Sequence, residues 1–291
     1  MSVVTITKEA AQTRQAAFAL KRLAPKFVAE VEGLDLSRRH SDETIARLRA
    51  ALVRHKLLLF RGQALSPREQ RDLAARFGSL HVHPLIENLS AEPEIIVLEY
   101  GEDRRLDDST WHTDVTFIDT PPQASILHAI VVPEVGGDTL FADLGAAYAA
   151  LSPPIQALLS RLRAKHDFAK SFRPDEKTAP DYADKWTRTR KTHAPVSHPV
   201  VRTHPESGEK GLFVNEGFTL SIEGLAPDES AALLEFLFHH SRKPEFTYRH
   251  RWQAGDVLFW DNRITQHYAV ADYWPSRRRM HRATILGDRP V

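Results

Sequence analysis

Cysteine is absent from the 291 residues of this chain. The protein therefore has no disulfide framework, no thiolate metal site and no cysteine nucleophile. Long apolar runs are missing as well, because nothing approaches the roughly 20 apolar residues that a membrane-spanning helix requires. Near the N-terminus, Lys8, Glu9 and Arg14 interrupt any apolar stretch. We therefore expect no signal peptide there, and a cytoplasmic protein.

An excess of charge of either sign is also missing. The chain carries 39 Lys and Arg against 38 Asp and Glu, a formal net charge of +1. This balance suggests neither nucleic acid nor a membrane surface as a partner. The length suits one large domain. We expect that domain over 23–291, preceded by a polar, Ala-rich and flexible extension at 1–22.

Local signals predict several helices and many short strands. A helix is expected over 41–54, running into the apolar strand 57–60. A second helix has Ser66 as its N-cap and Glu69 as the capping-box partner. Further helices are expected at 146–151, 155–166 and 228–240, and strands at 94–100, 111–117, 124–132, 139–142, 200–202, 212–214, 246–252 and 256–260.

Short strands separated by turns favour a mainly β fold with flanking helices. A double-sheet jelly roll fits this pattern, and the mouth of such a fold can hold a ligand. Periodicity alone does not distinguish it from another sandwich. Residues 170–195 are charged and punctuated by three prolines. Loops of that length are usually functional, and we interpret this one as a cover over the ligand pocket.

Two imidazoles and one carboxylate form the most informative pattern. His112 and Asp114 project to the same side if their segment is a strand. Alone, this pair also fits two polar residues on a solvated strand face. His267 is the candidate third ligand, although a chain with 15 His offers other candidates. Together the three residues form a 2-His-1-carboxylate set, which leaves one face of Fe(II) open and indicates oxygen chemistry.

Arg278 and Arg282 lie in a C-terminal stretch whose apolar end predicts a buried strand. On a strand they share one face and lie about 13 Å apart, at roughly 3.3 Å per residue. Two inward cations need two anions, and a guanidinium holds a carboxylate or sulfonate in a fixed fork. For Arg277 and Arg279 we prefer a simpler interpretation, a basic edge strand that discourages aggregation.

Five motifs carry a resemblance to a known family. They are Trp-His-Thr-Asp-Val-Thr-Phe at 111–117, Gly-Gly-Asp-Thr-Leu at 136–140, Phe-Val-Asn-Glu-Gly-Phe-Thr at 213–219, the segment 260–270, and Met-His-Arg-Ala-Thr-Ile-Leu-Gly-Asp at 280–288. From about Leu23 almost to its C-terminus, the chain resembles the bacterial taurine dioxygenase family of Fe(II)- and 2-oxoglutarate-dependent oxygenases. The resemblance implies a double-stranded β-helix, the use of Fe(II), 2-oxoglutarate and O2, and a homo-oligomer, either a dimer or a tetramer.

The resemblance also implies a reaction and a role for each matching residue. The reaction is hydroxylation of the carbon next to sulfur in taurine or a related sulfonate, which releases sulfite and an aldehyde beside succinate and CO2. The iron ligands would be His112, Asp114 and His267, and the distal carboxylate of 2-oxoglutarate would bind Arg278 and Thr139. Around the substrate, the matches are Arg282 and His83 on the sulfonate, the backbone amide of Val115 on a sulfonate oxygen, and Ser171, Phe172 and Phe218 as pocket walls.

Two positions depart from the family pattern. Asp108 replaces an Asn and could pair with an ammonium more strongly. Together with the intact motif at 213–219, it favours taurine or a close amino sulfonate. Ile86 replaces a Tyr near the substrate amine. That change instead fits a more apolar sulfonate or an alkyl sulfate ester, as in the related alkylsulfatase branch, and this alternative stays open.

Two other classes of function use the same residues differently. A zinc hydrolase with these three ligands leaves Arg278 and Thr139 without a ligand to hold. A non-catalytic jelly-roll binding protein needs no open metal position. The remaining conspicuous side chains have plainer interpretations: His81 and His239–His240 as structural, Asp261 and Asn262 as turn residues, and Trp111 and Trp260 as core aromatics beside the site.

Overall fold

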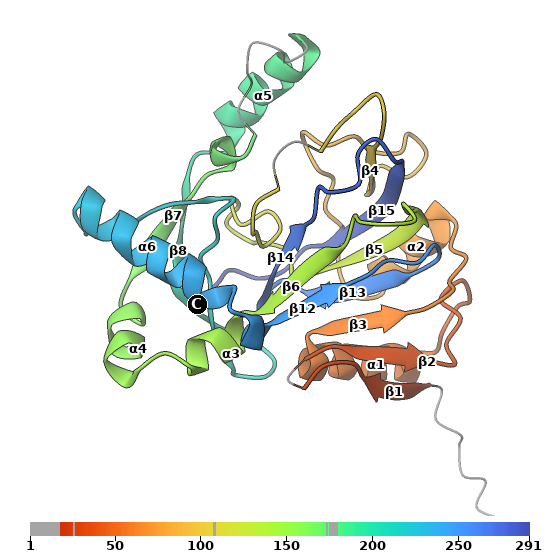
Figure 1. The fold of residues 1–291 in the computed structure, drawn as a ribbon, viewed down its shortest axis with the longest axis horizontal. Coiled ribbons are helices and arrows are strands. Elements are labelled where there is room, and N and C mark those ends of the chain that lie inside the picture. The colour runs from red at the N-terminus through yellow and green to blue at the C-terminus, as the bar shows by residue number, and fades with distance from the viewer. Residues whose placement is uncertain (1–17, 26, 107–108, 173, 175–179) are drawn as a thin grey trace, which may run out of the picture.

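The computed structural model describes residues 18–25, 27–106, 109–172, 174 and 180–291. Within them the larger layer is a seven-stranded sheet in the order β1-β2-β3-β13-β5-β15-β4 (Figure 1). Every pair of neighbours is antiparallel except β2 and β3. The strands are β1 (Ala19–Arg22), β2 (Ala29–Glu32), β3 (Leu57–Phe60), β4 (Ile95–Tyr100), β5 (Ala124–Val131), β13 (Val257–Asp261) and β15 (Arg278–Ile285).

A smaller sheet, in the order β12-β6-β14, forms the second layer. One buried cluster joins the two layers, because Phe141 of the smaller sheet packs with Leu127, Leu258 and Met280 of the larger one. Two facing antiparallel sheets of this kind form a jelly roll, so the predicted fold is confirmed. The remaining strands are β6 (Thr139–Asp143), β12 (Thr247–His250) and β14 (Thr265–Ala269) in this sheet, with β7 (Arg163–His166), β8 (Val196–Pro199), β9 (Val201–Thr203), β10 (Lys210–Leu212) and β11 (Thr219–Ile222) in two small sheets.

Helices cover the outer side of the large sheet and the opposite end of the molecule (Figure 1). Leu58 and Phe60 of β3 pack against α1 and α2, while Leu57 and Leu59 face the smaller sheet. This double burial explains why β3 is apolar at all four positions. The helices are α1 (Asp42–His55), α2 (Pro67–Ala75), α3 (Leu144–Ala149), α4 (Pro153–Leu159), α5 (Pro180–Thr192) and α6 (Pro227–Ser241), with short 3-10 turns at Phe168–Lys170 and Pro244–Phe246.

The predicted start of α2 is confirmed in detail. Ser66 Oγ accepts from the backbone N–H of Glu69, and the Glu69 carboxylate accepts from the N–H of Ser66. Further along the helix, Gln70 Nε2 donates to the carbonyls of Ile126 and His281, each at 2.9 Å. These two bonds fasten α2 across β5 and β15. The helix therefore holds the strand that carries Arg278 and Arg282.

The segment 111–117 is not the strand that the sequence predicted. Only His112 pairs with a neighbour, forming an isolated bridge with His267 of β14, and the chain then turns at residues 114–117. Val115 has a φ of +52°, in the left-handed region that a β-branched residue rarely adopts. The bridge explains how His112 is placed without a full strand.

Two other stretches differ from the prediction. The helix expected over 155–166 ends at Leu159, and Arg163–His166 forms β7 because it pairs with β8 and β11. Residues 170–195 are not a continuous loop, since they contain α5. Arg190 of α5 pairs with Asp167 at 2.6 Å, and α5 projects from the top of the molecule in Figure 1.

Arg277 and Arg279 do not belong to an edge strand. β15 lies between β5 and β4, so the interpretation as a basic edge was wrong. Both side chains instead form ion pairs with Glu99 of the neighbouring β4, at 2.6 and 3.0 Å. Glu99 therefore neutralises the outward arginines, while Arg278 and Arg282 are buried.

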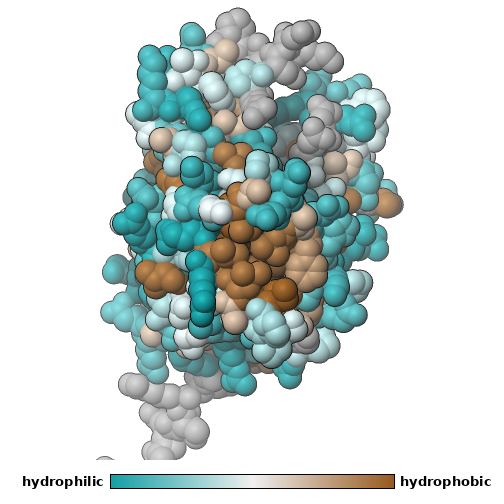
Figure 2. Space-filling view, turned by 90° about the vertical axis from the view of Figure 1, so that its left-hand side faces the viewer, coloured by the Kyte–Doolittle hydropathy of each residue, from teal (hydrophilic) through white to brown (hydrophobic). Residues whose placement is uncertain are grey.

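β1 falls within the stretch that the sequence assigned to an N-terminal extension, and it pairs with β2. Residues 1–17 lie outside the described residues, and the division into an extension and one domain stays a prediction. In the described part of the chain, no helix is long and apolar enough to span a membrane. Figure 2 shows an apolar area on the face that carries α4 and α6. Leu158 of α4 and Phe236 of α6 are exposed.

Candidate active site

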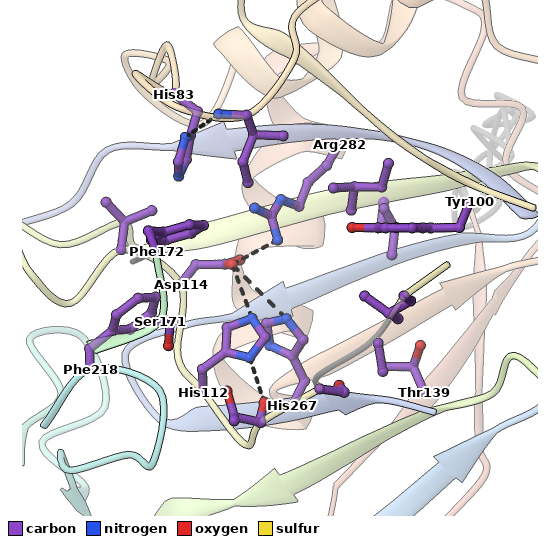
Figure 3. Close-up of a pocket in the computed structure, with 18 of the residues that line it drawn as sticks. His83, Tyr100, His112, Asp114, Thr139, Ser171, Phe172, Phe218, His267 and Arg282 are labelled. Carbon is purple, nitrogen blue, oxygen red and sulfur yellow. Dashed lines mark hydrogen bonds and ion pairs between the residues drawn. The ribbon is translucent and has the colours of Figure 1, made fainter. Parts of the chain in front are cut away.

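Three potential metal ligands converge at the mouth of the jelly roll (Figure 3). His112 Nε2 lies 3.9 Å from Asp114 Oδ1, and His267 Nε2 lies 4.0 Å from the same oxygen. The ligand atoms all lie within 4.8 Å of one another. Reciprocal backbone hydrogen bonds between His112 and His267 fix this approach. The structure thus brings together the three residues that the sequence proposed, and their donor set suits one divalent ion.

The two imidazoles are prepared to donate lone pairs. His112 Nδ1 donates to the carbonyl of Thr110 at 2.8 Å, which leaves its Nε2 unprotonated and aimed at Asp114. The ring of His267 packs against Trp260 and Phe141, with centroids 5.0 and 5.8 Å apart. Burial lowers the pKa of both histidines, so they are neutral, as metal binding requires.

Asp114 is an ionised carboxylate although it is only 2% exposed. Burial acts to raise its pKa, but the positive charge of Arg282 and the hydrogen bond from Ser125 outweigh burial and hold the pKa below its ordinary value. Arg282 Nη1 donates to Asp114 Oδ1 at 2.7 Å, and Ser125 Oγ donates to Oδ2 at 2.8 Å. From the sequence, Arg282 was predicted to bind the substrate alone, and neither of these two contacts to Asp114 was predicted.

A buried positive charge lies on another side of the cavity. Arg278 is 4% exposed, and within the described residues it forms no ion pair with a carboxylate. Its Nε donates to the carbonyl of Gly137 at 3.2 Å, and its guanidinium lies over the rings of Trp252 and Tyr273. A buried guanidinium without an acidic partner is costly. The site is therefore suited to an anionic ligand.

Thr139 lines the same part of the cavity as Arg278. Its Oγ1 accepts from the indole N–H of Trp252 at 2.9 Å. Because that indole only donates, the hydroxyl proton of Thr139 stays available for another acceptor. Tyr100 also lines the cavity, and neither it nor Trp252 was among the predicted site residues. Tyr100 ends a strand that the sequence did predict, but nothing in its local pattern distinguishes it from a structural tyrosine.

His83 presents a donor to the cavity. Its Nδ1 accepts the backbone N–H groups of Leu85 and Ile86 at 3.1 and 3.0 Å. The neutral ring therefore carries its proton on Nε2. Burial, followed by the charges of Arg282 and His81, lowers the pKa of His83 to about 3. A neutral imidazole N–H thus lies near Arg282, whose Nε is buried and has no partner within the described residues.

Aromatic and aliphatic side chains complete the cavity. Phe172 stacks on Phe218 at 6.0 Å, and Phe117 packs edge-on against Phe218 at 5.0 Å. Ser171 Oγ donates to the carbonyl of Gly217 at 2.6 Å, so this hydroxyl holds a loop in place. Asp108 lies outside the described residues. All the other predicted site residues line the cavity: His83, Ile86, His112, Asp114, Val115, Thr139, Ser171, Phe172, Phe218, His267, Arg278 and Arg282.

Two imidazoles and a carboxylate at the mouth of a jelly roll define the class of mononuclear non-haem iron oxygenases. The chain belongs to the family described as "Taurine catabolism dioxygenase TauD, TfdA family", whose model matches residues 19–284. It is similar to an alpha-ketoglutarate-dependent sulfate ester dioxygenase of Pseudomonas putida, at 40% identity over 92% of this chain and 89% of that protein.

An alkylsulfatase of Acinetobacter baylyi is 35% identical, over 92% of this chain and 85% of the relative. Among solved structures, a taurine dioxygenase from Burkholderia xenovorans matches with a TM-score of 0.79 and 37% identity. That match covers 94% of this chain and 91% of the other. Both the fold and the family expected from the sequence are therefore confirmed.

Proposed function

We propose that this enzyme oxidises alkyl sulfate esters with apolar tails and releases inorganic sulfate and an aldehyde. Its class is settled by its family: the enzyme is a 2-oxoglutarate-dependent dioxygenase that uses Fe(II) and O2. This class excludes the zinc hydrolase and the non-catalytic binding protein considered from the sequence. Taurine and other sulfonates are the alternative substrates.

In this proposal His112, Asp114 and His267 hold Fe(II). The cofactor and cosubstrates supply the hydroxylation of a C–H bond, with succinate and CO2 as coproducts. Arg278 and Thr139 bind the distal carboxylate of 2-oxoglutarate. The support is the buried guanidinium without an acidic partner and the hydroxyl proton that Trp252 leaves available.

His83 and Arg282 would grip the sulfate group of the substrate. Each offers an N–H group on the cavity side, and the backbone N–H of Val115 has no acceptor within the described residues. Three donors directed at one anion fix the position of the neighbouring carbon. Such positioning matters because a displacement of about 1 Å can cost roughly 10²-fold in rate.

The observation that carries the choice of substrate is the wall beside these donors. Ile86, Phe172 and Phe218 are apolar, and Asp114 is the only carboxylate among the described cavity residues. Asp114 is a candidate metal ligand already paired with Arg282, so the described part of the cavity holds no free carboxylate for an ammonium group. An uncharged tail suits this wall better than the amine of taurine. The names of the two relatives from Pseudomonas and Acinetobacter support the same choice.

A product assay distinguishes the two substrate classes. Hydroxylation of the carbon that bears the ester oxygen gives a product that collapses to the aldehyde, with cleavage of the C–O bond and release of sulfate. Hydroxylation next to a sulfonate gives a product that collapses with cleavage of the C–S bond and releases sulfite. Protein with Fe(II) and 2-oxoglutarate should convert hexyl sulfate to sulfate and hexanal, with one succinate per sulfate. Hexanol, which lacks the anion, is the control. Turnover of taurine at an equal or higher kcat/KM would overturn the proposal.

We also propose that the protein is cytoplasmic and that the chain associates with copies of itself. Leu158 of α4 and Phe236 of α6 are 46% and 45% exposed, and Figure 2 shows an apolar area on the face that carries these two helices. Exposed residues are acidic near the start of α6, at Asp228, and basic just after its end, at Lys243. Two copies packed with α6 antiparallel would therefore join opposite charges.

Light scattering during size exclusion tests this association. The parent should run above the 33.0 kDa of one chain, and Phe236→Glu should run as a monomer. Val135→Glu, at an exposed apolar residue between β5 and β6, is the control and should keep the parent mass. A monomeric parent would contradict the proposal.

A further inference from the structure

The two oxygens of the Asp114 carboxylate have different surroundings. Oδ1 faces both imidazoles and accepts from Arg282. Oδ2 points the other way and accepts from the hydroxyl of Ser125 at 2.8 Å. The carboxylate is therefore oriented so that one oxygen faces the candidate metal position and the other is held by the protein.

A chain of hydrogen bonds stands behind Ser125. Asn262 Nδ2 donates to Ser125 Oγ at 3.0 Å, and Trp260 Nε1 donates to Asn262 Oδ1 at 2.8 Å. Ser125 and Asn262 are fully buried, and Trp260 is 1% exposed. No solvent reaches these groups to replace a missing partner, so each must be satisfied by the others.

The chemistry of the indole sets the direction of the whole chain. Trp260 Nε1 can only donate, so the amide of Asn262 must turn its oxygen toward the indole and its NH2 toward Ser125. Ser125 Oγ then accepts from Asn262, and its own proton is directed to Asp114. With the opposite amide orientation, Asn262 would present its oxygen to Ser125 and draw the hydroxyl proton away from the carboxylate.

Trp260 also touches another part of the site. Its ring lies 5.0 Å from the ring of His267. Trp260 on β13 pairs directly with Ser125 on β5. One side chain therefore supports one imidazole by packing and the carboxylate through a chain of three hydrogen bonds.

We propose that Trp260, Asn262 and Ser125 are positioning residues that hold Asp114 as a ligand through Oδ1 alone. The inference rests on the proposed metal site and deepens it. Groups that hydrogen-bond to metal ligands typically contribute 10- to 100-fold to metal affinity. Without the Ser125 hydroxyl, the carboxylate loses the bond that fixes its rotation, and Arg282 is free to engage both of its oxygens.

Metal affinity measured without turnover tests this role. Mn(II) is titrated into metal-free protein, and free Mn(II) is followed by electron paramagnetic resonance. Ser125→Ala should bind Mn(II) 10- to 100-fold more weakly than the parent. Trp260→Phe keeps the ring beside His267 but removes the N–H donor, and it should weaken binding by a smaller factor.

Ser241→Ala is the matched control. Ser241 is equally buried, and its hydroxyl donates to the carbonyl of Leu237 within α6. Its removal should lower the melting temperature and leave Mn(II) affinity unchanged. Parent-like affinity in both Ser125→Ala and Trp260→Phe would overturn the positioning role while the metal site stands. A parent that does not bind Mn(II) would overturn both the inference and the proposed metal site.

Discussion

At the scale of single residues, groups that can only donate determine what the cavity offers a ligand. Two backbone N–H groups donate hydrogen bonds to His83 Nδ1, so the proton of the neutral ring lies on Nε2. The indole N–H of Trp252 donates a hydrogen bond to Thr139 Oγ1, so the hydroxyl proton of Thr139 stays available for another acceptor. In both cases a partner outside the cavity decides that the side chain acts as a donor. The cavity is thereby prepared for two anions, and protein groups already satisfy the other ends of these side chains.

The role of His83 leads to a prediction about pH. Its pKa of about 3, lowered first by burial, keeps the ring neutral from pH 5 to 9. The KM for the sulfate substrate should therefore show no dependence on a group titrating near 6.5. His83→Ala should raise that KM by about 10-fold or more, since it leaves the buried anion one donor short, with little change in the KM for 2-oxoglutarate.

Steady-state kinetics across this pH range check the prediction. His81→Ala is the control, because His81 packs beside His83 but does not line the cavity. It should keep the parent KM. If KM rises steeply as the pH rises through 6.5, the charged ring binds the substrate and the assignment of a neutral donor is wrong.

The sequence supplied the residues that bear chemistry and missed those that orient them. His112, Asp114, Arg278 and their neighbours belong to recognisable motifs, because few residue types can bind a metal or an anion. Ser125 and Trp252 carry no such signal. Their contribution comes from contacts with residues far along the chain, and those contacts follow from the register of paired strands.

At the scale of elements, local signals predicted what local forces determine. α2 begins where its capping residues predicted, and α1 begins at Asp42, one residue after the start that apolar periodicity predicted. The prediction of a strand over 111–117 was wrong, because the placement of His112 depends on one bridge to β14 and not on the β propensity of the segment. The prediction of a helix as far as residue 166 was wrong for a similar reason, since residues 163–166 pair with β8 and β11 and this pairing overrides their helical pattern.

Capping provides a matched pair of substitutions at this scale. Ser66→Ala removes a capping box and should lower the free energy of unfolding by about 1 kcal/mol. Ser152 is the N-cap residue of α4 but makes no side-chain capping bond, so Ser152→Ala should change stability very little. Chemical denaturation of both variants checks the difference. Equal losses in the two would show that the capping box of α2 adds nothing.

At the scale of the whole molecule, the site joins the two sheets. His267 lies on β14 of the smaller sheet, and Arg278 and Arg282 lie on β15 of the larger one. A metal ion and a cosubstrate bound between them add contacts that the unfolded chain lacks. Their binding should therefore stabilise the folded protein as a unit, by an amount that grows with the logarithm of ligand concentration over Kd.

The melting temperature should rise in two separable steps. Mn(II) at 100 times its Kd stabilises by about 2.7 kcal/mol, and 2-oxoglutarate at the same excess adds a similar amount. For a chain of 291 residues, each step corresponds to a rise of roughly 4 °C. Arg278→Ala should keep the Mn(II) step and lose the 2-oxoglutarate step, and a chelator should abolish both. If the 2-oxoglutarate step survives in Arg278→Ala, the cosubstrate carboxylate does not bind this guanidinium.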